Sequence, residues 1–215
     1  MGAAESYLQP GVYIDSDHPA VAAFAREHAR GSTELERAVS LYYAVRDGIR
    51  YNPFLDFTVD SAYRASSCLE AGEGFCVGKA ALLAASARAE GIPARVGFAD
   101  VRNHLSTPRL LEYIGSDLFV YHGYTELFLE GKWVKATPAF NVALCTKFRV
   151  KPLEFDGRND SIFHPYDEDS RRHMEYVRDR GNFADVPAAE IQKAFREFYP
   201  RLYGLGRDAA RETFG

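Results

Sequence analysis

The first half of the chain alternates between segments with helical spacing of apolar residues and segments rich in helix breakers. Apolar positions recur every three or four residues over 18–30 and 35–49, the spacing that gives a helix one buried face. The second of these segments follows Thr33, and Glu36 stands three residues later, as in a capping box. We therefore predict two amphipathic helices in this region.

Residues 76–90 form the clearest helical segment of the chain. Six alanines lie between residues 80 and 89, and such small side chains allow other elements to approach closely. Gly91 and Pro93 follow at the positions where a helix commonly ends. We predict a central helix that is buried on most sides.

After Pro93 the apolar period shortens from 3.6 to about two residues, which indicates strands. The strands are expected over 94–100, 121–129 and 132–137, with a tight hairpin turn between the last two. Helices precede strands instead of alternating with them, so the chain is predicted to have an α+β fold with N-terminal helices packed on an antiparallel sheet.

Beyond Cys145 the periodic signal weakens. We predict turns near 155–160 and short helices over 173–180 and 188–198. The polar and aromatic stretch 156–166 is expected to shape or cover a cleft.

The chain of 215 residues has the length of one large domain and contains no linker or repeat. We predict a single domain over 1–215, with a core at about 10–145. The extension 146–215 is expected to cover or flank the cleft. The oligomeric state stays open.

Composition narrows the class of protein. With 47% hydrophobic residues, intrinsic disorder is excluded. A net charge of −4 argues against nucleic acid or an anionic membrane as the main partner. No secretory leader or membrane-spanning apolar run is recognisable, so a cytoplasmic protein is expected.

Three cysteines are too few for a disulfide framework in a chain of this length, so at least one free thiol is expected. Cys68 and Cys145 lack metal-ligand spacing with each other or with a histidine and are expected to be buried, and no metal site is predicted.

Cys76 and His122 are the candidate catalytic residues. Cys76 begins the central helix, where unsatisfied N–H groups favour a thiolate and could bind an oxyanion. His122 opens a strand that is expected to pack on this helix, and an imidazole there could take the thiol proton. A purely structural role is the alternative for each residue taken alone.

Three further residues are expected to line the cleft. Phe75 immediately precedes Cys76, while Tyr124 and Glu126 share a strand face with His122 by two-residue alternation. A solvent-facing charge is the alternative for Glu126.

Three stretches carry a resemblance to a known family: YYAVRDGIRY at 42–51, GFCVGKAALLAASARAEGIPAR at 74–95 and HGYTELFLEGKWVKATP at 122–138. In this order they resemble the transglutaminase-like superfamily of cysteine hydrolases and acyltransferases. The resemblance implies a papain-like fold, with Cys76 as nucleophile and His122 as general base. It implies no metal and no organic cofactor.

The third catalytic position departs from the family pattern. An aspartate normally follows the hairpin tryptophan by four residues, and Thr137 stands there instead. A threonine hydroxyl could orient the imidazole but cannot stabilise its charged form. Asn141 is the alternative orienting residue.

The resemblance implies a peptidase, amidase or acyltransferase that acts on a peptide, a protein or a small amide through a thioester. The alternative is a catalytically weak or inactive domain of this family that binds peptides or proteins without turnover, and the threonine at position 137 is the feature in its favour.

Overall fold

The fold is seen in a computed structural model, which describes residues 5–104, 106–163, 169 and 174–204. Four α-helices come first, and their bounds are α1 Pro19–His28, α2 Glu34–Gly48, α3 Ala65–Ala71 and α4 Cys76–Ala89. Two short 3-10 helices, η1 Glu5–Leu8 and η2 Asp60–Tyr63, lie before α1 and before α3. The two amphipathic helices expected in this half are confirmed as α1 and α2.

The capping box at the start of α2 is formed as predicted. The Thr33 hydroxyl accepts the backbone N–H of Glu36, and the Glu36 carboxylate accepts the backbone N–H of Thr33 at 3.0 Å. A cap of this kind stabilises a helix by about 1 kcal/mol. It fixes the start of the helix that packs against α4.

Helix α4 is the buried centre of the fold, as its composition predicts. Thirteen of its fourteen residues are buried. Its one lysine, Lys79, is among them and donates from Nζ to the carbonyl oxygens of Arg46 at 2.9 Å and Ile49 at 2.6 Å. These bonds satisfy the buried amino group, whose pKa burial lowers to about 7, and tie the end of α2 to α4.

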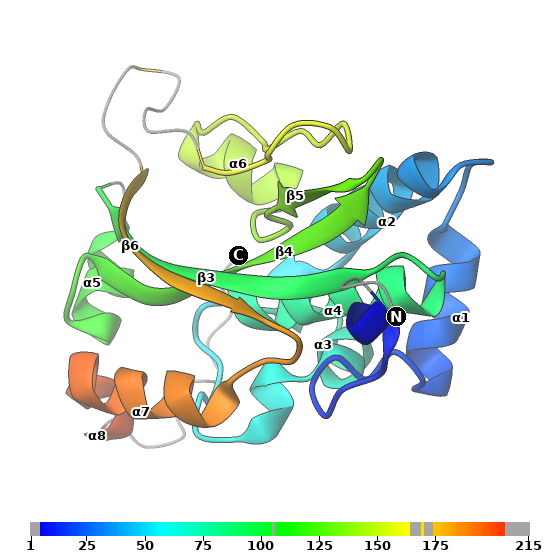
Figure 1. Ribbon diagram of the computed structural model, residues 1–215. Helices are drawn as coiled ribbons and strands as arrows, with labels where there is room; N and C mark the ends of the chain where they lie inside the picture. The colour runs from blue at the N-terminus through cyan, green and yellow to red at the C-terminus, as the bar shows by residue number, and fades with distance from the viewer. Residues whose placement is uncertain (1–4, 105, 164–168, 170–173, 205–215) are drawn as a thin grey trace.

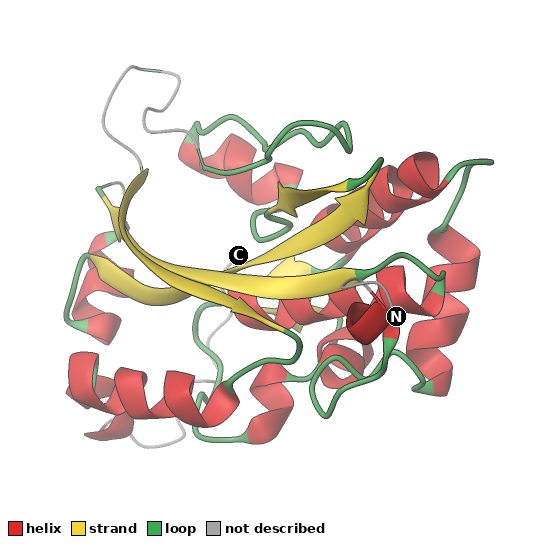
Figure 2. Ribbon diagram, viewed as in Figure 1, coloured by secondary structure: helices red, strands yellow, loops and turns green. Residues whose placement is uncertain are grey.

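The main sheet has four antiparallel strands in the order β5-β4-β3-β6. Their bounds are β3 Ala94–Asn103, β4 Leu118–Leu129, β5 Lys132–Ala136 and β6 Met174–Phe183. Figure 2 shows the strong twist of this sheet and the helices that flank it. The predicted α+β class with an antiparallel sheet is confirmed.

The predicted helix over 173–180 is wrong, because residues 174–183 form the edge strand β6; residue 173 lies outside the described part of the chain. Five consecutive residues of this strand, 175–179, are exposed. The strand therefore lacks the alternation of buried and exposed positions that identifies a half-buried strand in a sequence. Its conformation is set by pairing with β3.

The remaining helices are α5 Pro108–Ile114, between β3 and β4, and α6 Val142–Phe148, α7 Ala188–Phe198 and α8 Pro200–Gly204. The predicted helix over 188–198 is confirmed. In Figure 1, α7 and α8 lie at the lower left, below the end of the sheet where α5 also lies. Among the described residues, no helix is both long and apolar enough to cross a membrane.

Candidate active site

A short parallel ladder places Tyr51 beside the segment that leads into α4. Strand β1 Arg50–Tyr51 pairs with β2 Glu73–Gly74, and Tyr51 lies opposite Gly74. The backbone N–H of Asn52 donates to the Gly74 carbonyl oxygen at 3.0 Å, which continues the ladder. An ion pair between Arg50 and Glu73 closes it on the outside. Two segments far apart in the sequence thus meet two residues before Cys76.

Cys76 is the first residue of α4 and lies where that helix meets β4. A Cβ atom on Gly123 would lie 3.0 Å from the Val77 Cα atom, so the absence of a side chain at Gly123 allows the helix start to approach the strand closely. The Cys76 side chain is 8% exposed and lines a hollow together with His122. The structure therefore brings the two predicted catalytic residues to one cavity.

The pKa of the Cys76 thiol differs from what a helix start alone predicts. Burial raises the pKa to about 11, and the backbone N–H groups of Gly123, Val77 and Cys76 offset only part of that rise. Desolvation of the thiolate outweighs the favourable amides. In the resting protein Cys76 is a neutral thiol at pH 7.

His122 is also neutral at pH 7, because burial lowers its pKa to about 4. Its ring lies 5.0 Å from the ring of Phe163, measured between centroids. Within the described part of the chain its Nε2 atom has no hydrogen-bond partner. Phe163 belongs to the stretch 156–166 that was expected to shape the cleft, of which 164–166 lie outside the described residues.

A strained residue immediately precedes His122. Tyr121 has a φ of 55°, in the left-handed region that non-glycine residues rarely adopt. Its backbone N–H donates to Asp100 Oδ1 at 3.1 Å. Asp100 is buried and accepts three further bonds from Arg180 on β6, from Nε at 2.9 and 3.1 Å and from Nη2 at 2.7 Å. This ion pair holds the irregular backbone of β4 immediately before His122.

Thr137 lies just beyond the end of β5. The β4–β5 register pairs Thr125 with Ala136, so its continuation places Thr137 opposite Tyr124, two residues from His122. The Thr137 carbonyl oxygen accepts the Tyr42 hydroxyl at 3.2 Å. Its own Oγ1 atom is buried and without a hydrogen-bond partner among the described residues, so the structure contains no Thr137–His122 hydrogen bond.

Asn141 occupies the N-cap position of α6. Its side chain makes no capping hydrogen bond, while its carbonyl oxygen accepts the backbone N–H of Cys145 at 3.0 Å. Asn141 therefore lies at the start of α6 and does not line either hollow that contains His122.

Two hollows meet at the candidate site. The thiol hollow, of about 450 Å³, is lined by Tyr51, Pro53, Phe57, Phe75, Cys76, Ile114, Phe119, Val120, His122, Phe195, Tyr199 and Leu202. The side hollow, of about 610 Å³, is lined by Tyr51, Val101, Asn103, Ser106, Thr107, Leu110, Phe119, His122, Phe140, Leu144, Phe148, Val150 and Met174. The two share Tyr51, Phe119 and His122, and both are partly open to solvent.

The C-terminal third of the chain contributes to both hollows. Phe195 and Tyr199 line the thiol hollow from the end of α7. The Tyr199 hydroxyl also donates to the Leu118 carbonyl oxygen at 2.8 Å, which fixes this residue against β4. Met174, at the start of β6, lines the side hollow.

Of the three other residues expected to line the cleft, one lies at the candidate site and two lie elsewhere. Phe75 lines the thiol hollow beside Cys76. Tyr124 instead lines a separate hollow with Lys135 and lies 4.9 Å below the Lys135 ammonium group. Glu126 is buried and accepts a bond from Arg95 Nε at 2.7 Å, so it belongs to an ion pair away from both hollows of the candidate site.

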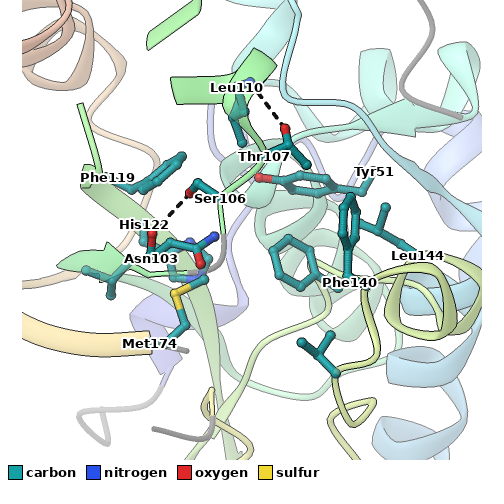
Figure 3. A pocket seen from close by; sticks show the side chains of 13 residues that line it. Tyr51, Asn103, Ser106, Thr107, Leu110, Phe119, His122, Phe140, Leu144 and Met174 are labelled. Atoms are coloured by element: carbon teal, nitrogen blue, oxygen red, sulfur yellow. Dashed lines mark hydrogen bonds between the residues drawn. The ribbon is translucent and has the colours of Figure 1, made fainter. Parts of the chain in front are cut away.

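Three residues near the site were not assigned a role from the sequence: Tyr51, Asp100 and Arg180. Figure 3 shows the Tyr51 hydroxyl pointing into the side hollow. Nothing in the local sequence identifies these residues, because each reaches the site through pairing with a distant segment.

Two further cysteines lie outside the two hollows of the candidate site. Cys68 and Cys145 are buried free thiols, like Cys76. Across residues 5–104, 106–163, 169 and 174–204, no group of three His, Cys, Asp or Glu side chains is placed to hold a metal ion.

A helix that begins with a cysteine, packed on an antiparallel sheet with a histidine on the adjoining strand, is the arrangement of papain-like folds. A model of the transglutaminase-like superfamily matches residues 22–138, just over half of the chain, and the chain belongs to this superfamily. No curated protein matches it.

Among solved structures, the chain is similar to a protein from Cytophaga hutchinsonii named "Putative Cysteine Protease", with a TM-score of 0.53 and 15% sequence identity. The alignment covers 88% of this chain and 50% of that protein, so the chain spans about half of its length. At this identity the likeness shows the fold alone.

Proposed function

We propose that the protein cleaves or transfers amides through a thioester on Cys76, as a peptidase, an amidase or an acyltransferase. The observation that carries the proposal is that Cys76 and His122 line one hollow, with the cysteine at the start of the buried helix. Membership of the transglutaminase-like superfamily supports the same class of chemistry. The substrate is a peptide, a protein or a small amide.

The reaction starts from a neutral thiol and a neutral imidazole, since their pKa values are about 11 and about 4. As the Cys76 sulfur bonds to the carbonyl carbon, His122 takes the thiol proton. The C–N bond then breaks, and His122 returns the proton to the departing nitrogen. The thioester that remains is attacked by water, which gives hydrolysis, or by an amine, which gives transfer.

The negative charge that develops on the carbonyl oxygen needs hydrogen-bond donors. The backbone N–H of Cys76, at the helix start, is one donor. The Tyr51 hydroxyl is the second, because Tyr51 lines both hollows where they meet and interacts electrostatically with Cys76. A preorganised donor of this kind contributes about a hundredfold or more to the rate.

Orientation of His122 relies on its backbone and its ring contacts. The Asp100–Arg180 pair holds Tyr121, and Phe163 packs on the imidazole. Thr137 becomes an orienting residue only if its side chain turns toward His122 when substrate binds.

A binding domain without turnover is the second candidate. One observation favours it: burial lowers the pKa of His122, and no carboxylate of the described residues favours the imidazolium. A domain of this kind would use the same two hollows to hold a peptide.

Trapping of an acyl-enzyme separates the two candidates. The protein is mixed with p-nitrophenyl acetate, quenched in acid and mapped by mass spectrometry. The proposal predicts acetyl on Cys76, loss of that label in Cys76→Ala and His122→Ala, and an unchanged label in Cys68→Ala. Absence of acetyl-Cys76, or equal labelling of Cys68 and Cys145, contradicts it. Addition of glycine ethyl ester then shows whether an amine competes with water.

A further inference from the structure

We infer that the side hollow binds an uncharged, apolar group attached to the nitrogen of the scissile amide. This inference rests on the proposed function, since it assigns one side of the same site. It concerns which amines the enzyme releases or accepts, a property that the thioester chemistry itself leaves open.

The position of the side hollow indicates the nitrogen side. It is lined by His122 but not by Cys76, whereas the thiol hollow is lined by both. The acyl carbon must lie on the Cys76 sulfur, while the nitrogen must lie within reach of the imidazole that protonates it. A group that extends from this nitrogen past His122 enters the side hollow.

The lining of the side hollow selects against charge. Among the described residues that line it, none is Asp, Glu, Lys or Arg. Val101 and Leu110 are buried, and Phe140 lies across the hollow from His122 (Figure 3). A charged group placed there would lose hydration without gaining an ionic partner, which is costly.

The hydroxyl groups of the side hollow are already engaged with the backbone. Ser106 Oγ donates to the Asn103 carbonyl oxygen at 3.2 Å, and Thr107 Oγ1 accepts the backbone N–H of Leu110 at 3.2 Å (Figure 3). The second bond caps α5. These side chains therefore hold the wall of the hollow, and the Tyr51 hydroxyl points into it.

The size of the side hollow fits a side chain or a small ring. Its cavity volume is about 50 Å³, within a space of about 610 Å³ that includes open solvent, so the enclosed part takes only a small group. The ligand class is therefore an aliphatic or aromatic amine component, held in an amide and carrying no charge.

Direct binding to the Cys76→Ala protein tests the pocket without requiring turnover. The probes are N-benzylacetamide and N-(4-carboxybenzyl)acetamide, which differ by one carboxylate, and Kd is measured by NMR titration. The inference predicts that the uncharged probe binds at least tenfold more tightly. Equal affinity, or tighter binding of the carboxylate, overturns it. This comparison needs no substitution in the hollow.

A matched pair of variants on α6 locates the binding. Leu144 lines the side hollow, whereas Val142 on the same helix is 41% exposed and lies outside its lining. In the Cys76→Ala background, Leu144→Asp is expected to weaken N-benzylacetamide binding at least tenfold, and Val142→Asp to leave it unchanged. Equal effects in two variants that both give a native NMR spectrum place the probe elsewhere and overturn the assignment.

The nitrogen side is tested on the acetyl-enzyme. Benzylamine and 4-(aminomethyl)benzoate are offered as acceptors, and the rates of acetyl transfer are compared. Transfer to benzylamine is expected to be at least tenfold faster; equal trapping, or trapping by neither amine, overturns the assignment. Failure of the proposed function looks different, because then no acetyl-Cys76 forms while N-benzylacetamide still binds the Cys76→Ala protein.

Discussion

The three cysteines have similarly raised thiol pKa values, but their surroundings differ. Burial raises the thiol pKa of Cys68 to about 12 and of Cys76 and Cys145 to about 11. Cys68 fills the space beside Gly74, where a Cβ atom would lie 2.5 Å from its sulfur. The Cys145 sulfur lies 3.9 Å from the Phe140 carbonyl oxygen.

Only Cys76, among the three, lies at a helix start, receives several backbone N–H groups and lines a hollow with a histidine. We therefore expect reactivity to depend on a proton acceptor and on space for a substrate, because the resting pKa does not separate the three thiols. The following changes test that distinction.

Removal of the proton acceptor is expected to have the largest effect. His122→Ala should slow acetylation of Cys76 by p-nitrophenyl acetate about a thousandfold, within the range for loss of a general base. Release of p-nitrophenol in a stopped-flow experiment gives the rate. Cys145→Ala serves as the control and should keep the normal rate. A normal acetylation rate in His122→Ala would show that His122 is not the proton acceptor that distinguishes Cys76 from the other two thiols.

Removal of the Tyr51 hydroxyl is expected to have the next largest effect. Tyr51→Phe should slow acetylation about a hundredfold, because one donor to the developing oxyanion is lost. Alkylation of Cys76 by iodoacetamide forms no oxyanion and should keep its rate. If both reactions slow equally, Tyr51 acts on the thiol or on the fold instead.

Loss of the ion pair that holds the backbone before His122 is expected to have a smaller effect. Arg180→Met leaves Asp100 buried without its partner and should slow acetylation about tenfold. Tyr121→Gly in the same background should restore part of the rate, since glycine adopts a φ of 55° without strain. Arg178→Met, on an exposed position of the same strand, is the control.

The outcome that contradicts this positioning role is specific. If Arg180→Met lowers the melting temperature but leaves the acetylation rate of the folded protein unchanged, the ion pair stabilises the sheet without orienting His122.

A carboxylate at the third catalytic position is expected to have the smallest effect. Thr137→Asp should raise the pKa of His122 above about 4 and increase acetylation by up to about tenfold, because a nearby negative charge favours imidazolium. NMR titration of the histidines and the stopped-flow rate measure both effects. Thr137→Asn, of the same size without the charge, should change neither quantity. An unaltered His122 pKa in a folded Thr137→Asp protein would show that this side chain does not reach the imidazole.

Local signals in the sequence were sufficient for α2 and for the two elements that carry the candidate catalytic residues. The capping box at Thr33, the alanine-rich helix from Cys76 and the strand that contains His122 each follow from neighbouring residues. The sequence motifs also identified the superfamily that the family model then matched.

Features that depend on pairing between distant segments could not be predicted from the sequence. The ladder that brings Tyr51 to Gly74 and the edge strand that supplies Arg180 are set by partners more than twenty residues away. The direction of the Cys76 pKa shift was also unpredictable, because the helix start gives one sign and burial in the folded protein gives the other, larger one.

The pH dependence of Cys76 alkylation tests the central claim most directly. Iodoacetamide labelling of the three cysteines is followed by mass spectrometry between pH 5 and 9. We predict that Cys76 is labelled fastest of the three cysteines. Its rate should fall by less than tenfold for each unit by which the pH is lowered, because neutral His122, with a pKa of about 4, accepts the thiol proton throughout this range. In His122→Ala the labelling rate of Cys76 should be lower, and it should fall tenfold for each unit by which the pH is lowered. A full tenfold slope in the unsubstituted protein, with rates equal to those of His122→Ala, would contradict a catalytic Cys76–His122 pair.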